Sequence, residues 1–188
     1  MALPRKLSVA AQWPEPIALS VNLSNLHLGN PGRLKHAIVK TLNDTGLAPN
    51  RLVLEITESV FLLDESHLTP FFGELRGMGI KIALDDFGTG YSSLSLLQNI
   101  PFDELKVDQS LIKQIGENTK TEESIKTIAK LGGLLEMTLV AEGVENERQL
   151  EFLRELGCQC MQGYLYGAPV TNDRFLGKFT RESEVCPV

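Results

Sequence analysis

The sequence contains few cysteines and no long apolar segment. Its three cysteines, Cys158, Cys160 and Cys186, are odd in number and include no C-x-x-C pair. This argues against a disulfide framework and against a cysteine zinc site, and indicates buried, reduced thiols. No stretch approaches about 18 consecutive apolar residues, and no apolar segment with a cleavage site follows the N-terminus. We therefore expect no membrane segment and no signal peptide, and a cytoplasmic location.

Positive charge is also in short supply. The chain has 18 Lys and Arg against 24 Asp and Glu, which gives a net charge of -6. Proteins that bind nucleic acid polymers do so mainly through a basic surface, so this class is disfavoured. Any phosphate bound here is expected to be held by metal ions. At 188 residues, with 43% hydrophobic and 22% charged residues, the chain is large enough for one soluble domain with a substantial core.

Six short apolar segments of strand length alternate with helical patterns. The expected strands cover residues 17–24, 52–58, 81–86, 104–108, 138–143 and 158–164. Helices are expected over residues 30–46, 68–77, 92–99, 121–135 and 146–157, with Asn30 and Asn146 as N-caps and Pro70 in the first turn of the second helix. We expect a remnant helix and linker over residues 1–16, a barrel domain over residues 17–170 and a loosely packed tail over residues 171–188.

Apolar strands that alternate with helices indicate a parallel sheet covered by helices. Two architectures fit: a doubly wound sheet, with its ligand at one switch point, and a (β/α) barrel, with functional residues at the carboxyl ends of almost all strands. Every expected strand carries a polar residue near its end. These residues are Asn22, Glu55, Asp85 with Asp86, Lys106, Glu142 and Gln162. The pattern favours a (β/α) barrel, and about six parallel strands are fewer than the eight of a complete TIM barrel, so we expect an incomplete barrel.

Asp85 and Asp86 stand out because two adjacent carboxylates end an apolar strand and precede a Gly-Thr-Gly loop. Strand periodicity points them to opposite faces, but at the end of a strand both can turn toward one ligand. A divalent metal ion would neutralise both, whereas without one their repulsion raises one pKa. The alternative interpretation is that the pair opens a turn and caps a helix.

Carboxylates, an amide oxygen and a lysine at a barrel mouth suit two-metal hydrolysis of a phosphodiester. Oxygen ligands favour Mg²⁺ or Mn²⁺, and the absence of a His or Cys cluster from the motifs disfavours zinc. Lys106 would hold the attacking water or the developing negative charge, or else would form only a salt bridge with a neighbouring carboxylate. An enolase-like barrel with a lysine base fits the same residues but gives no reason for the Asp-Asp-Phe-Gly-Thr-Gly loop.

Five motifs, in order along the chain, resemble those of the EAL domain family. They are Leu54-Glu55-Ile56-Thr57-Glu58, Asp85-Asp86-Phe87-Gly88-Thr89-Gly90-Tyr91-Ser92-Ser93-Leu94, Leu105-Lys106-Val107-Asp108, Ala141-Glu142-Gly143-Val144-Glu145 and Gln162-Gly163-Tyr164, preceded by Ser20-Val21-Asn22-Leu23-Ser24. The resemblance covers roughly residues 7 to 170. It implies a modified TIM barrel that hydrolyses cyclic di-GMP to pGpG with paired Mg²⁺ or Mn²⁺ ions. Ca²⁺ is expected to inhibit, because its larger radius spoils the required geometry.

The resemblance implies a role for each matching residue. Asn22, Glu55 and Asp85 would hold one metal ion. Asp85, Asp86 and Glu142 would hold the second. Lys106 would contact the catalytic water, so Lys106 and Glu142 are the catalytic candidates. Substrate-binding or supporting roles would fall to Gln162, Glu58, Thr89, Ser92 and Glu145, of which Glu58 and the loop over residues 86–93 would couple the site to a dimer interface.

The Glu-Ala-Leu motif that names the family does not occur in these 188 residues. We therefore interpret the chain as lacking the first strands of the barrel and one glutamate ligand. Loss of a charged ligand weakens Mg²⁺ binding, so the expected function is an impaired cyclic di-GMP phosphodiesterase. The alternative is a catalytically inactive module that binds cyclic di-GMP or a protein partner. Open sheet edges favour a homodimer. An upstream sensory or GGDEF domain is expected in a longer product.

Overall fold

The computed structural model describes residues 3–14, 16–57, 65–88, 97 and 99–182. Its strands are β1 (Leu19–Asn22), β2 (Leu52–Thr57), β3 (Lys81–Phe87), β4 (Glu104–Val107), β5 (Thr138–Glu142) and β6 (Cys160–Gln162). Its helices are α1 (Leu3–Ala10), α2 (Asn25–Leu28), α3 (Pro31–Thr45), η1 (Pro49–Arg51), α4 (Glu65–Gly77), α6 (Gln109–Ile112), α7 (Thr119–Leu134), α8 (Glu147–Glu155) and α9 (Asn172–Glu182). None of the helices in these ranges has the length and hydrophobicity that a membrane span requires.

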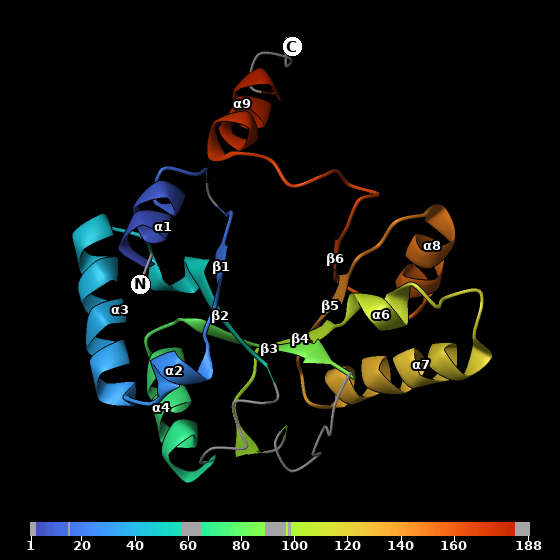
Figure 1. Cartoon of the computed structure of the whole chain (residues 1–188), viewed down its shortest axis with the longest axis horizontal. Helices are drawn as coiled ribbons and strands as arrows, with labels where there is room; N and C mark the ends of the chain where they lie inside the picture. Colours follow the sequence, from blue (N-terminus) through green and yellow to red (C-terminus); the bar gives the residue numbers. More distant parts are fainter. Residues whose placement is uncertain (1–2, 15, 58–64, 89–96, 98, 183–188) are drawn as a thin grey trace.

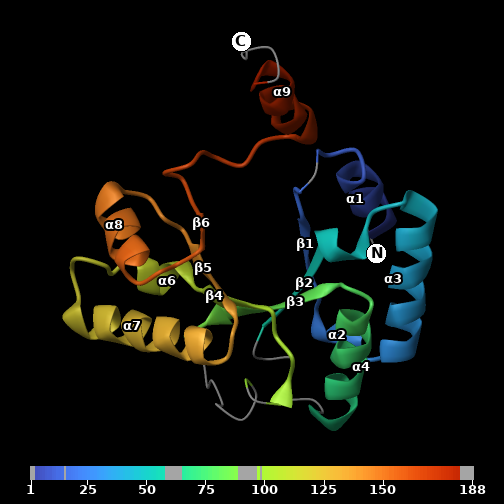
Figure 2. The same ribbon diagram turned by 180° about the vertical axis from the view of Figure 1, so that it is seen from behind.

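The strands form one parallel sheet in the order β1-β2-β3-β4-β5-β6. Each strand pairs with the next one along the chain, so the order never reverses as it does at the switch point of a doubly wound sheet. The sheet curls into an open half-barrel, with a gap between β1 and β6 (Figures 1 and 2). The predicted incomplete TIM-type barrel is therefore confirmed, and the doubly wound alternative is wrong.

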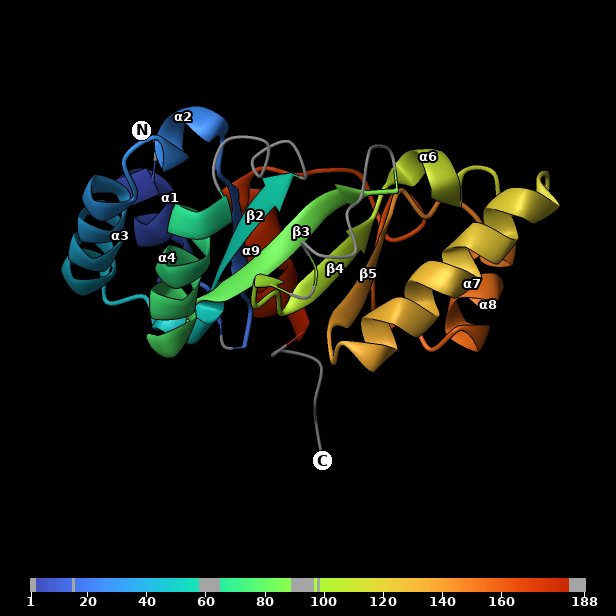
Figure 3. The ribbon, with the colours of Figure 1, turned by 90° about the horizontal axis from the view of Figure 1, so that it is seen from below.

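Helices surround the convex face of the sheet (Figure 3), and the hydrophobic core lies between the two. Leu54, Ile82 and Leu84 alternate along β2 and β3 and are fully buried. They belong to one apolar cluster with Phe72 and Leu75 of α4. Because successive residues of a strand point to opposite faces, the residues between them face the concave side. The core thus fixes which side chains reach the inside of the half-barrel.

The predicted helix caps are confirmed. Asn30 accepts a hydrogen bond from the backbone N–H of Arg33, and Gly46 ends α3 in the left-handed conformation. Asn146 and Gln149 form a reciprocal capping box at the start of α8. One expectation is wrong: α4 begins at Glu65, so Pro70 lies inside the helix and not in its first turn. The helix expected over residues 92–99 lies almost entirely outside the described residues.

Buried Arg51 ties the first helix to the sheet. Its guanidinium donates to the backbone carbonyls of Ile17 (2.8 Å), Ala10 (2.9 Å) and Trp13 (3.0 Å). The Ala10 carbonyl ends α1, and the carbonyls of Trp13 and Ile17 lie on the connection between α1 and β1. A buried charge is tolerated when its donors are satisfied in this way. The contact anchors the β1 edge of the half-barrel.

A helix also follows Pro169, where the sequence predicts only a loose tail. Helix α9 lies beside the gap between β1 and β6 in Figure 1. Its Asn172 side chain accepts a hydrogen bond from Trp13 Nε1 at 2.8 Å, and the ring of Phe175 meets the Trp13 ring edge-on at 5.1 Å between centroids. These contacts join residues 159 positions apart in the chain, which a local sequence pattern cannot reveal.

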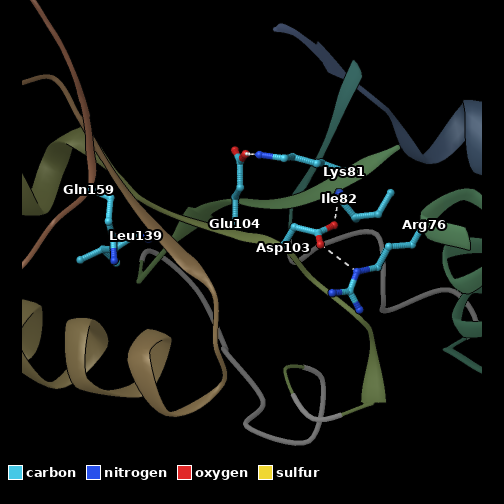
Figure 4. A network of polar contacts seen from close by, with 7 residues as sticks. All are labelled: Arg76, Lys81, Ile82, Asp103, Glu104, Leu139 and Gln159. Atoms are coloured by element: carbon cyan, nitrogen blue, oxygen red, sulfur yellow. Dashed lines mark hydrogen bonds and ion pairs between the residues drawn. The ribbon is translucent and has the colours of Figure 1, made fainter. Parts of the chain in front are cut away.

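Two side chains satisfy backbone N–H groups at the starts of the strands (Figure 4). Asp103 Oδ2 accepts from the N–H of Ile82 at 2.9 Å, while its Oδ1 accepts from Arg76 Nε at 2.8 Å. Gln159 Oε1 accepts from the N–H of Leu139 at 2.9 Å. Each side chain replaces a missing ladder carbonyl, because buried N–H groups need a partner. The strand starts are thereby fixed in register.

Candidate metal and phosphodiester site

The carboxyl ends of the strands bring together the polar residues that the sequence predicts there. Glu55 lies on β2, Asp85 on β3, Lys106 on β4 and Glu142 on β5. Lys106 Nζ lies 2.7 Å from Glu55 Oε1, 2.8 Å from Asp85 Oδ1 and 2.6 Å from Glu142 Oε1. Four neighbouring strands therefore point one charged group each at a common centre on the concave face.

Lys106 is the centre of this cluster. Its side chain is 7% exposed, and those of Glu55, Asp85 and Glu142 are 9%, 11% and 17% exposed. Burial opposes the ammonium charge, but the close contacts with Asp85, Glu142 and Glu55 outweigh it and raise the pKa of Lys106 above its usual range. The lysine therefore stays charged. Near the strand starts, a weaker pair joins Lys81 and Glu104 at 3.4 Å (Figure 4).

A break in the regular ladder turns the side chain of Asp86 to the same side of the sheet as that of Asp85. The β3–β4 register shifts between Leu84 and Phe87, and Asp86 adopts a left-handed conformation with φ of +57°. Such a bulge redirects a side chain that strand periodicity would send to the other face. One carboxylate oxygen each of Asp85, Asp86 and Glu142 lies within 4.8 Å of the others. The predicted convergence of the two aspartates is thus observed, through a bulge.

The oxygen atoms of this cluster fit a divalent cation. Asp85 Oδ1 is buried and has no hydrogen-bond partner of acceptable angle, although Lys106 Nζ lies 2.8 Å away. Burial, followed by the charge of Asp85, raises the pKa of Asp86. Burial also raises the pKa of Glu142, although its hydrogen bond to Lys106 acts in the opposite direction. Buried carboxylates with lone pairs to spare are ligands suited to a hard metal ion.

Gln162 and a cavity complete the site on the β6 side. Gln162 Nε2 donates to Glu142 Oε1 at 2.8 Å. Beside them lies a cavity of about 820 Å³. It is lined by Glu142, Glu145, Gln162 and Gly163 together with the aromatic residues Trp13, Tyr164, Tyr166 and Phe175. A volume of this size, lined by both polar groups and aromatic rings, suits a small-molecule ligand.

The other predicted residues are exposed or lie outside the described part of the chain. Asn22 ends β1 beside Glu55 in the ladder, and its side chain is exposed. Glu145 is exposed, and its Oε1 lies 3.8 Å from Lys113 Nζ. Its backbone N–H donates to Oε1 of buried Gln149. The predicted roles of Glu58, Thr89 and Ser92, and most of the loop over residues 86–93, fall outside the described residues.

Sequence reasoning missed Asp108, whose charge contributes to the raised pKa of Asp86. Asp108 follows Lys106 by two positions, so the two-residue strand period was the signal that could have found it. It also caps α6 by accepting from the N–H of Ser110. Trp13 was missed as a cavity residue, because its position depends on the distant helix α9.

Comparison with known proteins decides the family. A family model described as "EAL domain" matches residues 3–169. The chain belongs to the EAL domain family. Its relatives include the bifunctional diguanylate cyclase/cyclic di-GMP phosphodiesterase MucR of Pseudomonas aeruginosa, which is 39% identical over 158 residues, 84% of this chain and 23% of MucR. The EAL domain thus spans about a fifth of the length of the curated relatives it matches.

Solved structures agree with the EAL assignment. The structure of the MucR phosphodiesterase in complex with c-di-GMP has a TM-score of 0.87 and 36% identity, covering 93% of this chain and 72% of that one. The EAL domain of DcpA from Mycobacterium smegmatis has a TM-score of 0.89 and 32% identity, with coverages of 95% and 82%. BlrP1 of Klebsiella pneumoniae, in a manganese/cy-diGMP complex, has a TM-score of 0.82 and 29% identity, with coverages of 91% and 44%.

Proposed function

We propose that this EAL domain binds paired Mg²⁺ or Mn²⁺ ions and hydrolyses cyclic di-GMP to linear pGpG. The observation that carries the proposal is the concave cluster in which one carboxylate oxygen each of Asp85, Asp86 and Glu142 lies within 4.8 Å of the others, with the Asp85 side chain 11% exposed. The relative MucR is named as a cyclic di-GMP phosphodiesterase, and BlrP1 was solved with manganese and cy-diGMP. Both names support cyclic di-GMP as the substrate of this chain, and the BlrP1 complex supports manganese as its metal.

The ligand sets follow the strand ends. Asn22, Glu55 and Asp85 would hold the first ion, and Asp85, Asp86 and Glu142 the second. Four carboxylates and one ammonium give the cluster a formal charge of three negative units. Two divalent ions would change this to one positive unit, which attracts a phosphodiester anion. Metal binding thereby explains how an acidic chain can hold a phosphate.

The side chains divide the chemistry between them. Bound divalent ions supply a water of lowered pKa and neutralise charge on the phosphodiester. Lys106, which stays protonated, would donate to the attacking water or to the oxygen that gains negative charge once a metal ion takes over one of its three carboxylate contacts. Gln162 holds the Glu142 carboxylate in position through the 2.8 Å hydrogen bond. The aromatic wall of the adjacent cavity gives the planar bases of the substrate a surface on which to stack.

Activity is expected to be weak, because the first ion would have two charged ligands, Glu55 and Asp85, and one amide ligand, Asn22. The alternative function is a module that binds cyclic di-GMP without cleaving it. The ion pairs of Lys106 with all three carboxylates favour this alternative, since they satisfy the site without metal. A homodimer, an upstream sensory or GGDEF domain and a cytoplasmic location stay predictions.

The test is incubation with cyclic di-GMP and Mn²⁺, followed by chromatography for pGpG. We expect slow formation of pGpG, no product with Asp85→Asn, and inhibition by Ca²⁺ because its larger radius loosens the ligand geometry. Asp44→Asn is the matched control, because Asp44 is exposed and pairs only with Lys40 among the ion pairs described. Binding of cyclic di-GMP without product would support the binding module instead. Absence of both binding and turnover would refute the proposal.

A further inference from the structure

The edge strand β6 carries Gln162 but has little sheet around it. It comprises only Cys160–Gln162 and pairs with β5 alone in the described sheet. Figure 1 shows it beside the open gap of the half-barrel. The side chains of Cys160 and Gln162 are exposed, and Met161 is half-buried. Short edge strands with so few contacts are held weakly by the ladder alone. Something else must hold Gln162 within reach of Glu142.

Backbone hydrogen bonds continue past the ends of both strands. The N–H of Val144 donates to the carbonyl of Gln162 at 3.0 Å, and the N–H of Leu165 donates to the carbonyl of Val144 at 3.0 Å. Val144 is fully buried. The segment after β5 and the segment after β6 are therefore joined directly beyond Glu142 and Gln162.

This close backbone pairing of the two segments requires glycine at position 163. A Cβ built on Gly163 would overlap the backbone nitrogen, carbonyl carbon and oxygen of Val144. Backbone atoms cannot rotate away as a flexible side chain can, so any larger residue must push the two segments apart. Gly167, four residues on in the same connection, also has a positive φ, +142°, but nothing lies within 4 Å of its Cβ position.

We infer that Gly163 is a positioning residue of the metal site, which acts through Gln162 on Glu142. The close approach of Gly163 to Val144 holds Gln162 Nε2 2.8 Å from Glu142 Oε1. The same oxygen of Glu142 lies 2.6 Å from Lys106 Nζ. Separation of the two segments removes the hydrogen bond that orients Glu142. The inference rests on the proposed function, because it concerns the geometry of the proposed metal ligands.

The test measures Mn²⁺ dissociation constants by calorimetry for the wild type and for Gly163→Ala, Gln162→Ala, the double variant and Gly167→Ala. Loss of a partner that orients a metal ligand typically costs about tenfold or more in affinity. We expect about tenfold weaker binding for Gly163→Ala and for Gln162→Ala, and no further loss in the double variant, because both changes remove one interaction. Gly167→Ala, which shares the positive φ but not the close contact, should stay within about twofold of the wild type.

Affinity of Gly163→Ala within about twofold of the wild type, or an additive loss in the double variant, overturns the inference. If Gly163→Ala does not fold, hydrogen exchange of the wild-type backbone amides, measured with and without Mn²⁺, tests the inference instead. Mn²⁺ should slow exchange of the Val144 and Leu165 amides more than that of the Cys158 amide, which bonds to Leu153. Equal slowing overturns the inference. If the wild type cleaves cyclic di-GMP but the losses of Mn²⁺ affinity add in the double variant, only the inference about Gly163 fails. If the wild type binds Mn²⁺ but cleaves no cyclic di-GMP, only the proposed hydrolase activity fails. A wild type that binds no Mn²⁺ overturns both.

Discussion

Replacement of Lys106 with methionine removes the ammonium from the carboxylate cluster with little change in volume. Lys106 Nζ lies within 2.8 Å of an oxygen of each of Glu55, Asp85 and Glu142. Methionine has nearly the same length and fills the same space, so the variant tests charge and not packing. Three carboxylates are then left close together with no positive partner among the ion pairs described.

The size of the effect follows from burial. Removal of one partner from a buried ion pair typically costs about 3–5 kcal/mol, because the remaining charge is uncompensated. Glu142, with 17% of its side chain exposed, retains some contact with water, so the lower end of that range applies. For a chain of this length, about 3 kcal/mol corresponds to a fall of about 6–12 °C in melting temperature.

Differential scanning calorimetry in EDTA, and then with excess Mn²⁺, measures the effect. Lys126→Met is the matched control, because Lys126 is exposed and pairs with Glu123 on the same helix; its melting temperature should barely change. A fixed Mn²⁺ concentration of about 100 times the wild-type dissociation constant adds about 2.7 kcal/mol to the wild type. It should stabilise Lys106→Met more than the wild type, because no ammonium competes for the carboxylates. A variant as stable as the wild type in EDTA, or one that gains nothing extra from Mn²⁺, would refute this reasoning.

Three further outcomes are expected. Arg51→Met removes the hydrogen bonds to the carbonyls of Ile17, Ala10 and Trp13, of which Ala10 keeps a bond from the Trp13 N–H. It should lower the unfolding free energy in urea by about 3 kcal/mol, and a loss below about 1 kcal/mol would contradict the anchoring role of Arg51. Asp86→Gly and Glu136→Gly each relieve a positive φ and should stabilise the metal-free chain by about 1 kcal/mol, but only Asp86→Gly should weaken Mn²⁺ binding in calorimetry. Burial raises the pKa of Cys158 to about 11, so little thiolate forms there at pH 8. Iodoacetamide should therefore modify exposed Cys160 before Cys158, as tandem mass spectrometry can show, and faster labelling of Cys158 would contradict its burial.

Much of the fold could be predicted from the sequence because parallel strands buried on both faces read as short apolar runs. Residues 52–58 and 138–143 match β2 and β5 to within one residue. The barrel was predicted from the polar residues at the strand ends, of which Asn22 is the first and Gln162 the last, since a doubly wound sheet does not explain one at every strand. Helices α2 and α6 have four residues each, too few to show a helical period.

Helix α9 shows a different limit of sequence reasoning. Its pattern is amphipathic, but residues after Pro169 lie beyond the last strand, where no further strand indicates what they pack against. Trp13 supplies the partner through Asn172 and Phe175. A contact over such a separation depends on how the whole sheet curls, and no local propensity encodes that curvature.

The bulge at Asp86 shows why the identity of the site residues was easier to predict than their geometry. In a regular strand, Asp86 would face the helices and Asp85 the concave side. The left-handed φ of Asp86 costs an aspartate about 1 kcal/mol or more, and the resulting proximity of Asp85 further raises the pKa of Asp86. Both effects oppose folding of the metal-free chain, so apolar packing around β3 must outweigh them. A hard cation would relieve the repulsion but not the backbone strain. The strain is therefore a permanent cost of bringing adjacent residues to one face, whereas the repulsion is a cost that the proposed metal ions remove.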